Sequence, residues 1–531
     1  WWGQVTALVS AEVRPQMTEH LQALTRKEFI TPNPSKIPEN DAFRFTHALL
    51  RDVTYHGIPK SARSRLHEQT AAWLVNRMGK RAGEYDEIIG YHLEQACRAL
   101  TELGPTSGAA QALGRQASGR LASAAARAFA SEDMQGTVSL LSRALALLPE
   151  KDPGRLELLP RLAFALMETG DFGRLAQVIE ETSLLAGAAG DERALALAGV
   201  LERWIRLFTD PDRGPAQARD AVRGAISTFE AAGDDYGLAK AWSLLGLANI
   251  VLAQFGDAET AWARAAVHAR RAGERRDELD ALTWGLVGSW AGPSPVEAGL
   301  ARTDGLLEQA RGDRKGMSGV LFMRAALTAS LGRFGEARGL IARARTLCRE
   351  VGLTLWEAGP VTQMAGVVEL LAGDAAAAET VLQTGAQQLS EIGETGWLST
   401  VLAWLAEAVY LQGRADQAYQ LSEECEQLAE GGDVFSRVLW RSVRARVLAD
   451  RGRAADAERL SREAVALADD TDSLALQADA RLGLTHVLHT LGRGGAAEQT
   501  LAEAIDLYQR KGAVAAIARA KDVAYYTDDR G

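Results

Sequence analysis

Small and hydrophobic residues recur along most of this chain with a period of about 40 residues, the length of one helical repeat unit. Five segments share a polar turn followed by an alanine-rich amphipathic helix: "LGRFGEAR", "LAGDAAAAE", "LQGRADQAY", "DRGRAADAE" and "TLGRGGAAE". Their turn residues follow one another at a nearly constant spacing, at Gly332, Gly373, Gly413, Gly452 and Gly492. Weaker copies extend the series to Pro293, Ala253, Arg213, Gly170 and Glu132. This period predicts an array of ten helix–turn–helix units.

Three positions of each unit hold small side chains. Five residues after the turn residue, eight units have alanine: Ala218, Ala258, Ala298, Ala337, Ala378, Ala418, Ala457 and Ala497. Twelve residues after it, nine units have a small residue: Ala144, Ala225, Ala265, Gly305, Ala344, Gly385, Cys425, Ala464 and Ala504. Seven residues before it, the small residues are Ala125, Ala163, Gly246, Ala325, Gly366, Ala406 and Ala445. Small side chains let helices approach closely, so neighbouring units are expected to stack and bury their faces.

These three columns resemble those of the tetratricopeptide repeat. That repeat has a period of about 34 residues, so the helices here are expected to be longer. HEAT repeats, with a period of about 40 to 47 residues, are the alternative. The pattern predicts an all-α fold, a right-handed solenoid of about ten helix pairs over residues 110–512. A capping helix and tail are expected at 513–531.

Residues 1–80 do not follow the repeat. The stretch "EFITPNPSKIPENDAFRFTH" is typical of two strands joined by a proline- and asparagine-rich loop, with short helices before it and a helix after it. Phe29 and Ile30 belong to the first strand, while Phe43 and Phe45 alternate with polar residues in the second, which predicts one buried face. This order predicts a winged-helix domain over residues 1–80, followed by a linker helix at 81–109.

Composition narrows the class of protein. The chain has 531 residues, a net charge of −10 and a pI of about 5.5, so nucleic-acid binding through this segment is not expected. Three widely spaced cysteines, Cys97, Cys348 and Cys425, form no disulfide framework or zinc motif and fit the cytoplasm. No apolar run reaches the ~18 to 20 residues of a membrane span. The sequence does not begin with Met, and it is expected to be a piece of a longer protein.

Motifs of catalysis are not found in the sequence. "LHEQT" at 66–70 begins like a zincin motif, but Ala71 stands where the second histidine is required. His486 and His489 lie three residues apart on one helix face without a third ligand nearby in sequence. The sequence also has no phosphate loop and no nucleophile elbow. We therefore expect no enzyme activity and no cofactor in this chain.

Three tryptophans are candidates for partner binding. Trp204, Trp284 and Trp404 each lie nine residues before a turn residue, on the first helix of a unit. In tetratricopeptide arrays the first helices line the concave groove, where an exposed tryptophan anchors a protein, peptide or small-molecule partner. The alternative is packing between adjacent units, which is common for large aromatic residues.

The N-terminal part resembles a known family. The stretches "FRFTHALLRDVTYHGIPKSARSRLHEQTAAWL" and "YDEIIGYHLEQACRALTELGP", followed by the repeats, resemble the C-terminal half of bacterial signal-transduction ATPases of the STAND class. These proteins have an ATPase core, a winged helix and a helical-repeat sensor. Some carry a nucleotide-cyclase domain and others a LuxR-type helix-turn-helix. The resemblance implies an ATPase core of the same polypeptide as a partner, with ATP or ADP and Mg²⁺ bound to that core.

The same resemblance implies a role for His47. In STAND proteins a histidine at the start of a winged-helix helix contacts the ADP phosphate and keeps the protein closed. His47 occupies that place, and Arg51 is a second nucleotide-sensing candidate, although Ala48 stands where related motifs have Asp. His47 could instead cap its helix or pack under the wing. The alternatives for the whole chain are a free-standing interaction scaffold and a transcriptional regulator whose DNA-binding domain lies elsewhere.

Overall fold

The computed structural model describes residues 2–33, 42–104, 107–209, 214–429 and 433–528. The chain divides into two compact units, Trp1–Ala165 (unit 1) and Leu166–Gly531 (unit 2), and the division falls inside helix α8 (Arg155–Thr169). The division into segments at 80, 109 and 512 that the sequence favours stays a prediction. None of the described helices combines the length and the apolar character needed to cross a membrane.

Unit 1 consists of helices and one small sheet. Strands β1 (Ile30–Asn33) and β2 (Ala42–Phe45) pair antiparallel, with Ile30 opposite Phe45. The predicted loop between them includes residues 34–41, which lie outside the described residues. The helical elements of unit 1 are α1 (Trp2–Leu8), η1 (Arg14–Gln16), α2 (Met17–Arg26), α3 (Ala48–Gly57), α4 (Lys60–Met78), η2 (Gly79–Tyr85), α5 (Asp86–Thr101), α6 (Gly108–Ala130) and α7 (Met134–Ala146).

The expected burial of the alternating phenylalanines is wrong for this hairpin. Ile30 is buried and Phe43 is partly buried, but Phe29 and Phe45 are exposed to 43% and 40%. The hairpin has two strands among the described residues, so no further strand covers the edge and face that carry Phe45. Alternation thus predicted the strand correctly but not the layer needed to cover it.

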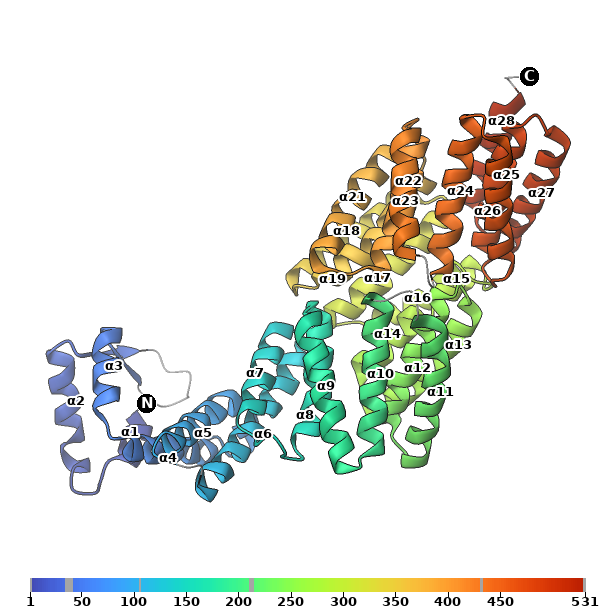
Figure 1. Cartoon of the computed structure of the whole chain (residues 1–531). Helices are drawn as coiled ribbons and strands as arrows, with labels where there is room; N and C mark the ends of the chain where they lie inside the picture. The colour runs from blue at the N-terminus through green and yellow to red at the C-terminus, as the bar shows by residue number, and fades with distance from the viewer. Residues whose placement is uncertain (1, 34–41, 105–106, 210–213, 430–432, 529–531) are drawn as a thin grey trace. The chain divides into compact units, whose positions relative to one another are not determined.

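Unit 2 is built from helices alone among its described residues (Figure 1). Its elements are α9 (Phe172–Ala189), α10 (Glu192–Thr209), α11 (Gly214–Ala232), α12 (Asp235–Val251), α13 (Phe255–Ala272), α14 (Arg275–Trp284), α15 (Val287–Trp290), α16 (Val296–Gln309), α17 (Arg314–Ser330), α18 (Phe334–Glu350), α19 (Thr354–Trp356), η3 (Glu357–Val361), α20 (Thr362–Leu371), α21 (Ala375–Ile392), α22 (Gly396–Leu411), α23 (Ala415–Ala429), α24 (Val434–Asp450), α25 (Ala454–Asp469), α26 (Leu474–Thr490), α27 (Gly494–Lys511) and α28 (Val514–Asp528). The two helices of each predicted unit follow one another in this order, and the predicted all-α, tetratricopeptide-like solenoid is confirmed.

The turn residues identified from the sequence share one backbone conformation. The six glycine turn residues all have positive φ, between 72° and 80°: Gly170, Gly332, Gly373, Gly413, Gly452 and Gly492. Glu132 and Ala253 occupy the same place in their units and also have positive φ, 65° and 52°. Glycine adopts this conformation readily, whereas other residues are strained by it. The same turn geometry therefore recurs in units whose turn residue is not glycine.

The small-residue columns are packing positions, as predicted. Ala337, Ala378, Ala418 and Ala457 are all 0% exposed, and so is Cys425. Three glycines of the columns have no room for a methyl group: a Cβ on Gly246 would lie 2.5 Å from the Trp262 ring, one on Gly366 2.5 Å from Leu382, and one on Gly385 2.4 Å from Thr362. Helices therefore touch at these positions, and bulk cannot be added there without moving a helix. The prediction is wrong for Gly305, which is exposed and has open space around its Cα.

One unit departs from the predicted register. In the units with well-defined turns the second helix begins two residues after the turn residue, but α16 begins three residues after Pro293, since Pro295 precedes it as the N-cap. The column therefore shifts by one residue, so that Ala298 is exposed and Gly299 is buried. A Cβ on Gly299 would lie 2.4 Å from Ser289 Cβ, which marks Gly299 as the true packing position.

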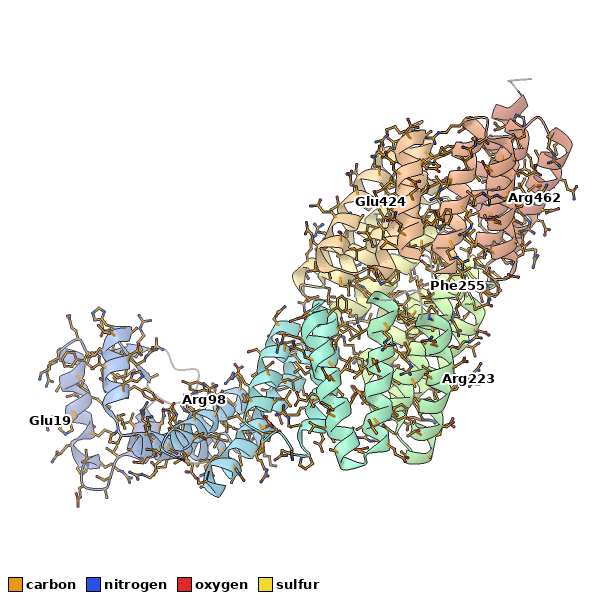
Figure 2. All side chains as sticks on the ribbon, viewed as in Figure 1. Glu19, Arg98, Arg223, Phe255, Glu424 and Arg462 are labelled. Atoms are coloured by element: carbon orange, nitrogen blue, oxygen red, sulfur yellow. The ribbon has the colours of Figure 1, made fainter. Side chains whose placement is uncertain are left out.

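Hydrogen bonds also join the last repeats of unit 2 to repeats more than 200 residues earlier in the chain, and we call this the closure of the unit. The turn before α26 reaches the start of α13, where the Asp472 carboxylate accepts hydrogen bonds from the backbone nitrogens of Phe255 and Gly256, both at 2.7 Å. Lys511 Nζ, at the end of α27, donates to the carbonyl oxygens of Gly288, Gly292 and Ser294 at 2.9, 2.7 and 2.6 Å. Figure 2 labels Phe255 at this junction, inside unit 2. The solenoid thus brings repeats that are distant in the sequence into contact.

We expect Ala337→Leu, Ala418→Leu and Ala457→Leu each to lower the free energy of unfolding by about 1 to 3 kcal/mol, because each overfills a closed helix contact. Thermal unfolding followed by circular dichroism measures the effect. Ala298→Leu is the matched control, since its side chain faces water, and it should change stability by less than about 0.5 kcal/mol. Unchanged melting of all three column variants would mean that these columns do not hold the helices together.

Candidate ligand-binding site

The inner face of unit 2 encloses a cavity of about 80 Å³. The lining comes from the first helices of seven successive repeat units, with Phe255 at the start of α13 as the exception: Leu207, Leu247, Ile250, Val251, Phe255, Trp284, Val287, Trp290, Phe322, Met323, Pro360, Gln363, Met364, Gly396, Trp397, Ser399, Thr400, Asp433 and Phe435. The first helices therefore form the concave wall, as the resemblance to tetratricopeptide repeats predicts.

Aromatic rings form much of this wall. The rings of Trp284 and Trp397 are roughly parallel, with their centroids 5.9 Å apart. The ring centroid of Phe435 lies 6.0 Å from that of Trp290 and 6.1 Å from that of Phe255. These rings come from helices that are distant in sequence, so the cavity depends on the curvature of the whole unit.

Three polar side chains of the cavity wall, those of Ser399, Thr400 and Asp433, form one hydrogen-bonded group. Asp433 is the N-cap of α24, and its carboxylate accepts hydrogen bonds from the backbone nitrogens of Phe435 and Ser436. The hydroxyls of Ser399 and Thr400 donate to Asp433 Oδ2, both at 3.1 Å. Burial raises the pKa of Asp433, and the hydrogen bonds from Ser436, Thr400 and Ser399 offset this rise only in part. The carboxylate thus lacks the full stabilisation that water would give it.

Gln363 adds an unpaired acceptor to the same cavity. Its side chain is 4% exposed, and its Oε1 has no hydrogen-bond partner among the described residues. A buried amide oxygen left unpaired costs about 1 to 3 kcal/mol. This atom is where a bound ligand would contribute a donor.

A second cavity, also of about 80 Å³, lies beyond Trp290 and Phe435, which line both spaces. Trp404, Asp479, Tyr508, Lys511 and Arg519 contribute to its wall. Burial lowers the pKa of Lys511 to about 7, while Glu259 and Asp472 act in the opposite direction. Because Lys511 is occupied by three carbonyl groups, we assign it to the closure of the unit.

Unit 2 also contains two largely buried ion networks. Lys315 Nζ bonds to Glu168 Oε1 at 2.7 Å and to Asp280 Oδ2 at 2.8 Å. Burial favours a higher pKa for Glu168, yet Lys315 and Arg276 hold it below its usual value, whereas the pKa of Asp280 is raised by burial. In the second network Glu407 pairs with Arg446 and, at 2.9 Å, with Arg519 of α28.

The three predicted tryptophans lie in different surroundings. Trp284 lines the first cavity, and its ring also contacts Trp262, Trp356 and Phe322. Trp404 is buried and lines the second cavity, and Trp204 packs partly buried against the core. Packing against other residues of unit 2 therefore buries much of each tryptophan side chain. The role of the three tryptophans in partner binding stays a prediction.

His47 and Arg51 belong to unit 1, whereas both cavities belong to unit 2. His47 is the N-cap residue of α3, but its side chain makes no capping hydrogen bond and is exposed. His47 thus occupies the N-cap position of α3 without a side-chain capping bond, and its exposure contradicts packing under the wing. Arg51 is exposed and pairs with the adjacent Asp52. The nucleotide-sensing role of both residues stays a prediction.

A chain of hydrogen bonds links α3 to the next helices of unit 1. Tyr55 OH contacts His67 Nε2 at 2.8 Å, and His67 Nδ1 contacts His92 Nδ1 at 2.9 Å. Burial, together with the neighbouring Arg63 and His67, lowers the pKa of both histidines, that of His92 to about 4. No group of three or more potential metal ligands exists among the residues that the structure describes.

Reasoning from the sequence missed most of the cavity. Gln363, Trp397, Asp433 and Phe435 were not selected, because their helices meet only after the unit has closed. The available signal was the excess of tryptophan on first helices between residues 284 and 404, where Trp290, Trp356 and Trp397 accompany the two predicted residues.

No family model matches the chain, and no curated protein matches it. Its fold is similar to that of solved helical solenoids. A Rap protein in complex with competence and sporulation factor has a TM-score of 0.53 and 12% identity, covering 68% of this chain and 99% of the Rap chain. The Cut9–Hcn1 hetero-tetramer of the APC/C has a TM-score of 0.49 and 15% identity, covering 89% of this chain and 92% of the matched chain. The likeness to the Rap protein places the fold of this chain among tetratricopeptide-like helical solenoids.

Proposed function

We propose that this chain is the regulatory segment of a cytoplasmic signal-transduction ATPase of the STAND class. In this proposal the solenoid binds an effector, and a winged helix carrying His47 couples that event to the nucleotide held by the ATPase core. Catalysis belongs to the parent protein, which carries the ATPase and either a cyclase or a DNA-binding output domain. The observation that carries the proposal is an uncovered apolar surface around His47.

This surface, here called the His47 patch, comprises Phe29, Phe45, Leu49 and Val53. Leu49 and Val53 are exposed to 75% and 64%, and they follow His47 on the first turns of α3. Leu49 and Val53 lie one turn apart on the same face of α3, and exposed apolar surfaces mark interaction sites in soluble proteins. We assign the ATPase core of the same polypeptide as the partner, because the family resemblance places that core directly before this segment.

The His47 side chain is placed to contact an anion held by such a partner. It stands at the N-terminus of α3, where unpaired backbone N–H groups favour negative charge, and it is not engaged in capping. The hydrogen-bonded chain Tyr55–His67–His92 then links α3 to α4 and α5. Movement of α3 would therefore be transmitted towards the repeat array.

The test uses the full-length protein with its ATPase core. His47→Ala should weaken ADP retention by about ten- to a hundredfold, because a hydrogen bond to a charged group is worth about 1.5 to 3 kcal/mol. Basal output should rise as the closed state loses the same contact. ADP dissociation measured by stopped-flow fluorescence gives the result.

His56→Ala on the same helix is the matched control, since His56 is exposed and its Nδ1 contacts the Asp52 carbonyl oxygen of its own helix. It should leave ADP retention unchanged. The present chain with His47→Ala should melt like the parent chain, and neither should bind ATP tightly. If full-length His47→Ala retains ADP as tightly as the parent protein, the sensing role of His47 is refuted.

A further inference from the structure

The charge and shape of the first cavity define its ligand more narrowly than the fold does. Asp433 is the single ionisable residue among the described residues that line it, and it is partly exposed. The described salt bridges include none to Asp433, and its hydrogen-bond donors are hydroxyl and backbone groups. A negative group therefore faces an enclosed space without a cation beside it.

The aromatic wall favours the same kind of ligand. Aromatic faces carry negative potential and attract ammonium groups, most strongly where water is excluded. Trp284, Trp397 and Phe435 bring such rings to the cavity that Asp433 also lines. An apolar group alone would contact the rings but would leave the carboxylate of Asp433 without a cationic partner and Gln363 Oε1 without a hydrogen-bond donor.

The size of the cavity limits the ligand. Its volume of about 80 Å³ is roughly half of the ~150 Å³ cavity that is known to hold benzene. It has room for a compact head group of a few heavy atoms, and a length of polypeptide exceeds it.

We propose that this cavity binds a small organic cation, an ammonium group with apolar substituents, between the aromatic rings and Asp433. Gln363 Oε1 accepts a hydrogen bond from the cation where it carries an N–H, or contacts its polarised methyl groups. The inference rests on the proposed function in one respect, namely that the occupant is the effector that the solenoid senses.

The experiment measures binding to this chain by calorimetry and by tryptophan fluorescence. The probes are isopropylammonium and its uncharged counterpart isopropanol, with butylammonium and butanol as a second pair. Each cation should bind at least tenfold more tightly than its neutral partner. Equal binding of charged and neutral probes would show an apolar cavity only and would overturn the proposal, as would binding of peptides without binding of either cation.

Variants identify the site. Asp433→Asn keeps an N-cap side chain, so α24 should remain capped. This substitution should weaken the binding of the cations at least tenfold and leave the binding of the neutral probes unchanged. Asp313→Asn is the matched control, because Asp313 caps α17 through Gly316 N and does not line the cavity. Unaltered cation affinity in Asp433→Asn would contradict the assignment.

Two further measurements keep the test decisive. If Asp433→Asn does not fold, Gln363→Met tests the same cavity. This variant should bind butylammonium at least threefold more weakly than the parent chain. The full-length protein separates this inference from the proposed function. Cations that bind the chain but do not alter ADP release would leave the site in place and refute its role as sensor.

Discussion

Lys315→Met should destabilise unit 2 by about 3 to 5 kcal/mol, one of the two largest effects expected of a single substitution here. Lys315 is 4% exposed and holds two carboxylates, Glu168 of α8 and Asp280 of α14. Methionine fills similar space but leaves both carboxylates largely buried without their ammonium partner. Hydrogen exchange should show the loss of protection along α17, on which Lys315 lies.

The loss should depend on pH in a defined direction. Burial already raises the pKa of Asp280 above its ordinary value of 3.8, and Lys315 opposes that rise. In the variant the folded-state pKa of Asp280 rises further, so the carboxyl is neutral and tolerated near pH 4. Stability is then lost as the pH rises through the folded-state pKa. The difference from the parent should therefore be smaller at pH 4 than at pH 7.

Arg206→Met is the control for this prediction. Arg206 pairs with Glu202 on the surface of α10, where both side chains are about half exposed. Exposed pairs contribute about 0 to 1 kcal/mol, so the melting temperature should barely change. A loss as large as that of Lys315→Met would mean that burial is not what makes the Lys315 network important.

Glu407→Gln should have a comparable effect, about 3 to 5 kcal/mol, centred on the C-terminal end of unit 2. Glu407 is buried on α22 and pairs with Arg446 of α24 and Arg519 of α28. Burial favours a higher pKa for Glu407, but the two arginines hold it below its usual value, so it is ionised in the folded protein. Removing that charge leaves two guanidinium groups without their shared partner and loosens α28. Limited proteolysis should then cut the chain within α28 before other sites.

Glu458→Gln is the matched control, since Glu458 also accepts hydrogen bonds from two arginines, Arg462 and Arg493, but at the surface. It should cost less than about 1 kcal/mol. Equal proteolysis of α28 in the parent and in Glu407→Gln would contradict the role of this pair in docking the last helix.

The sequence determined the repeat of this protein, because the repeat is a local property. A helix pair needs small residues where its own helices and its neighbours touch, so Ala337, Ala418 and Cys425 mark buried positions wherever the unit stands in the chain. The turn conformation is equally local, and it was located even at Glu132 and Ala253, where glycine is absent. The hairpin before His47 was also predictable from alternation and from its proline-rich loop.

Tertiary structure alone decided the site and its surroundings. Asp472 caps α13 and Lys511 binds the carbonyl groups around α15, although the partners lie several repeats apart in the sequence. No pattern within one repeat encodes such contacts, because they depend on curvature summed over several units. The same summation brings Trp284, Gln363 and Asp433 to one cavity. Alternation, likewise, showed that Phe45 lies on a strand, but whether another layer covers that strand is a property of the folded chain.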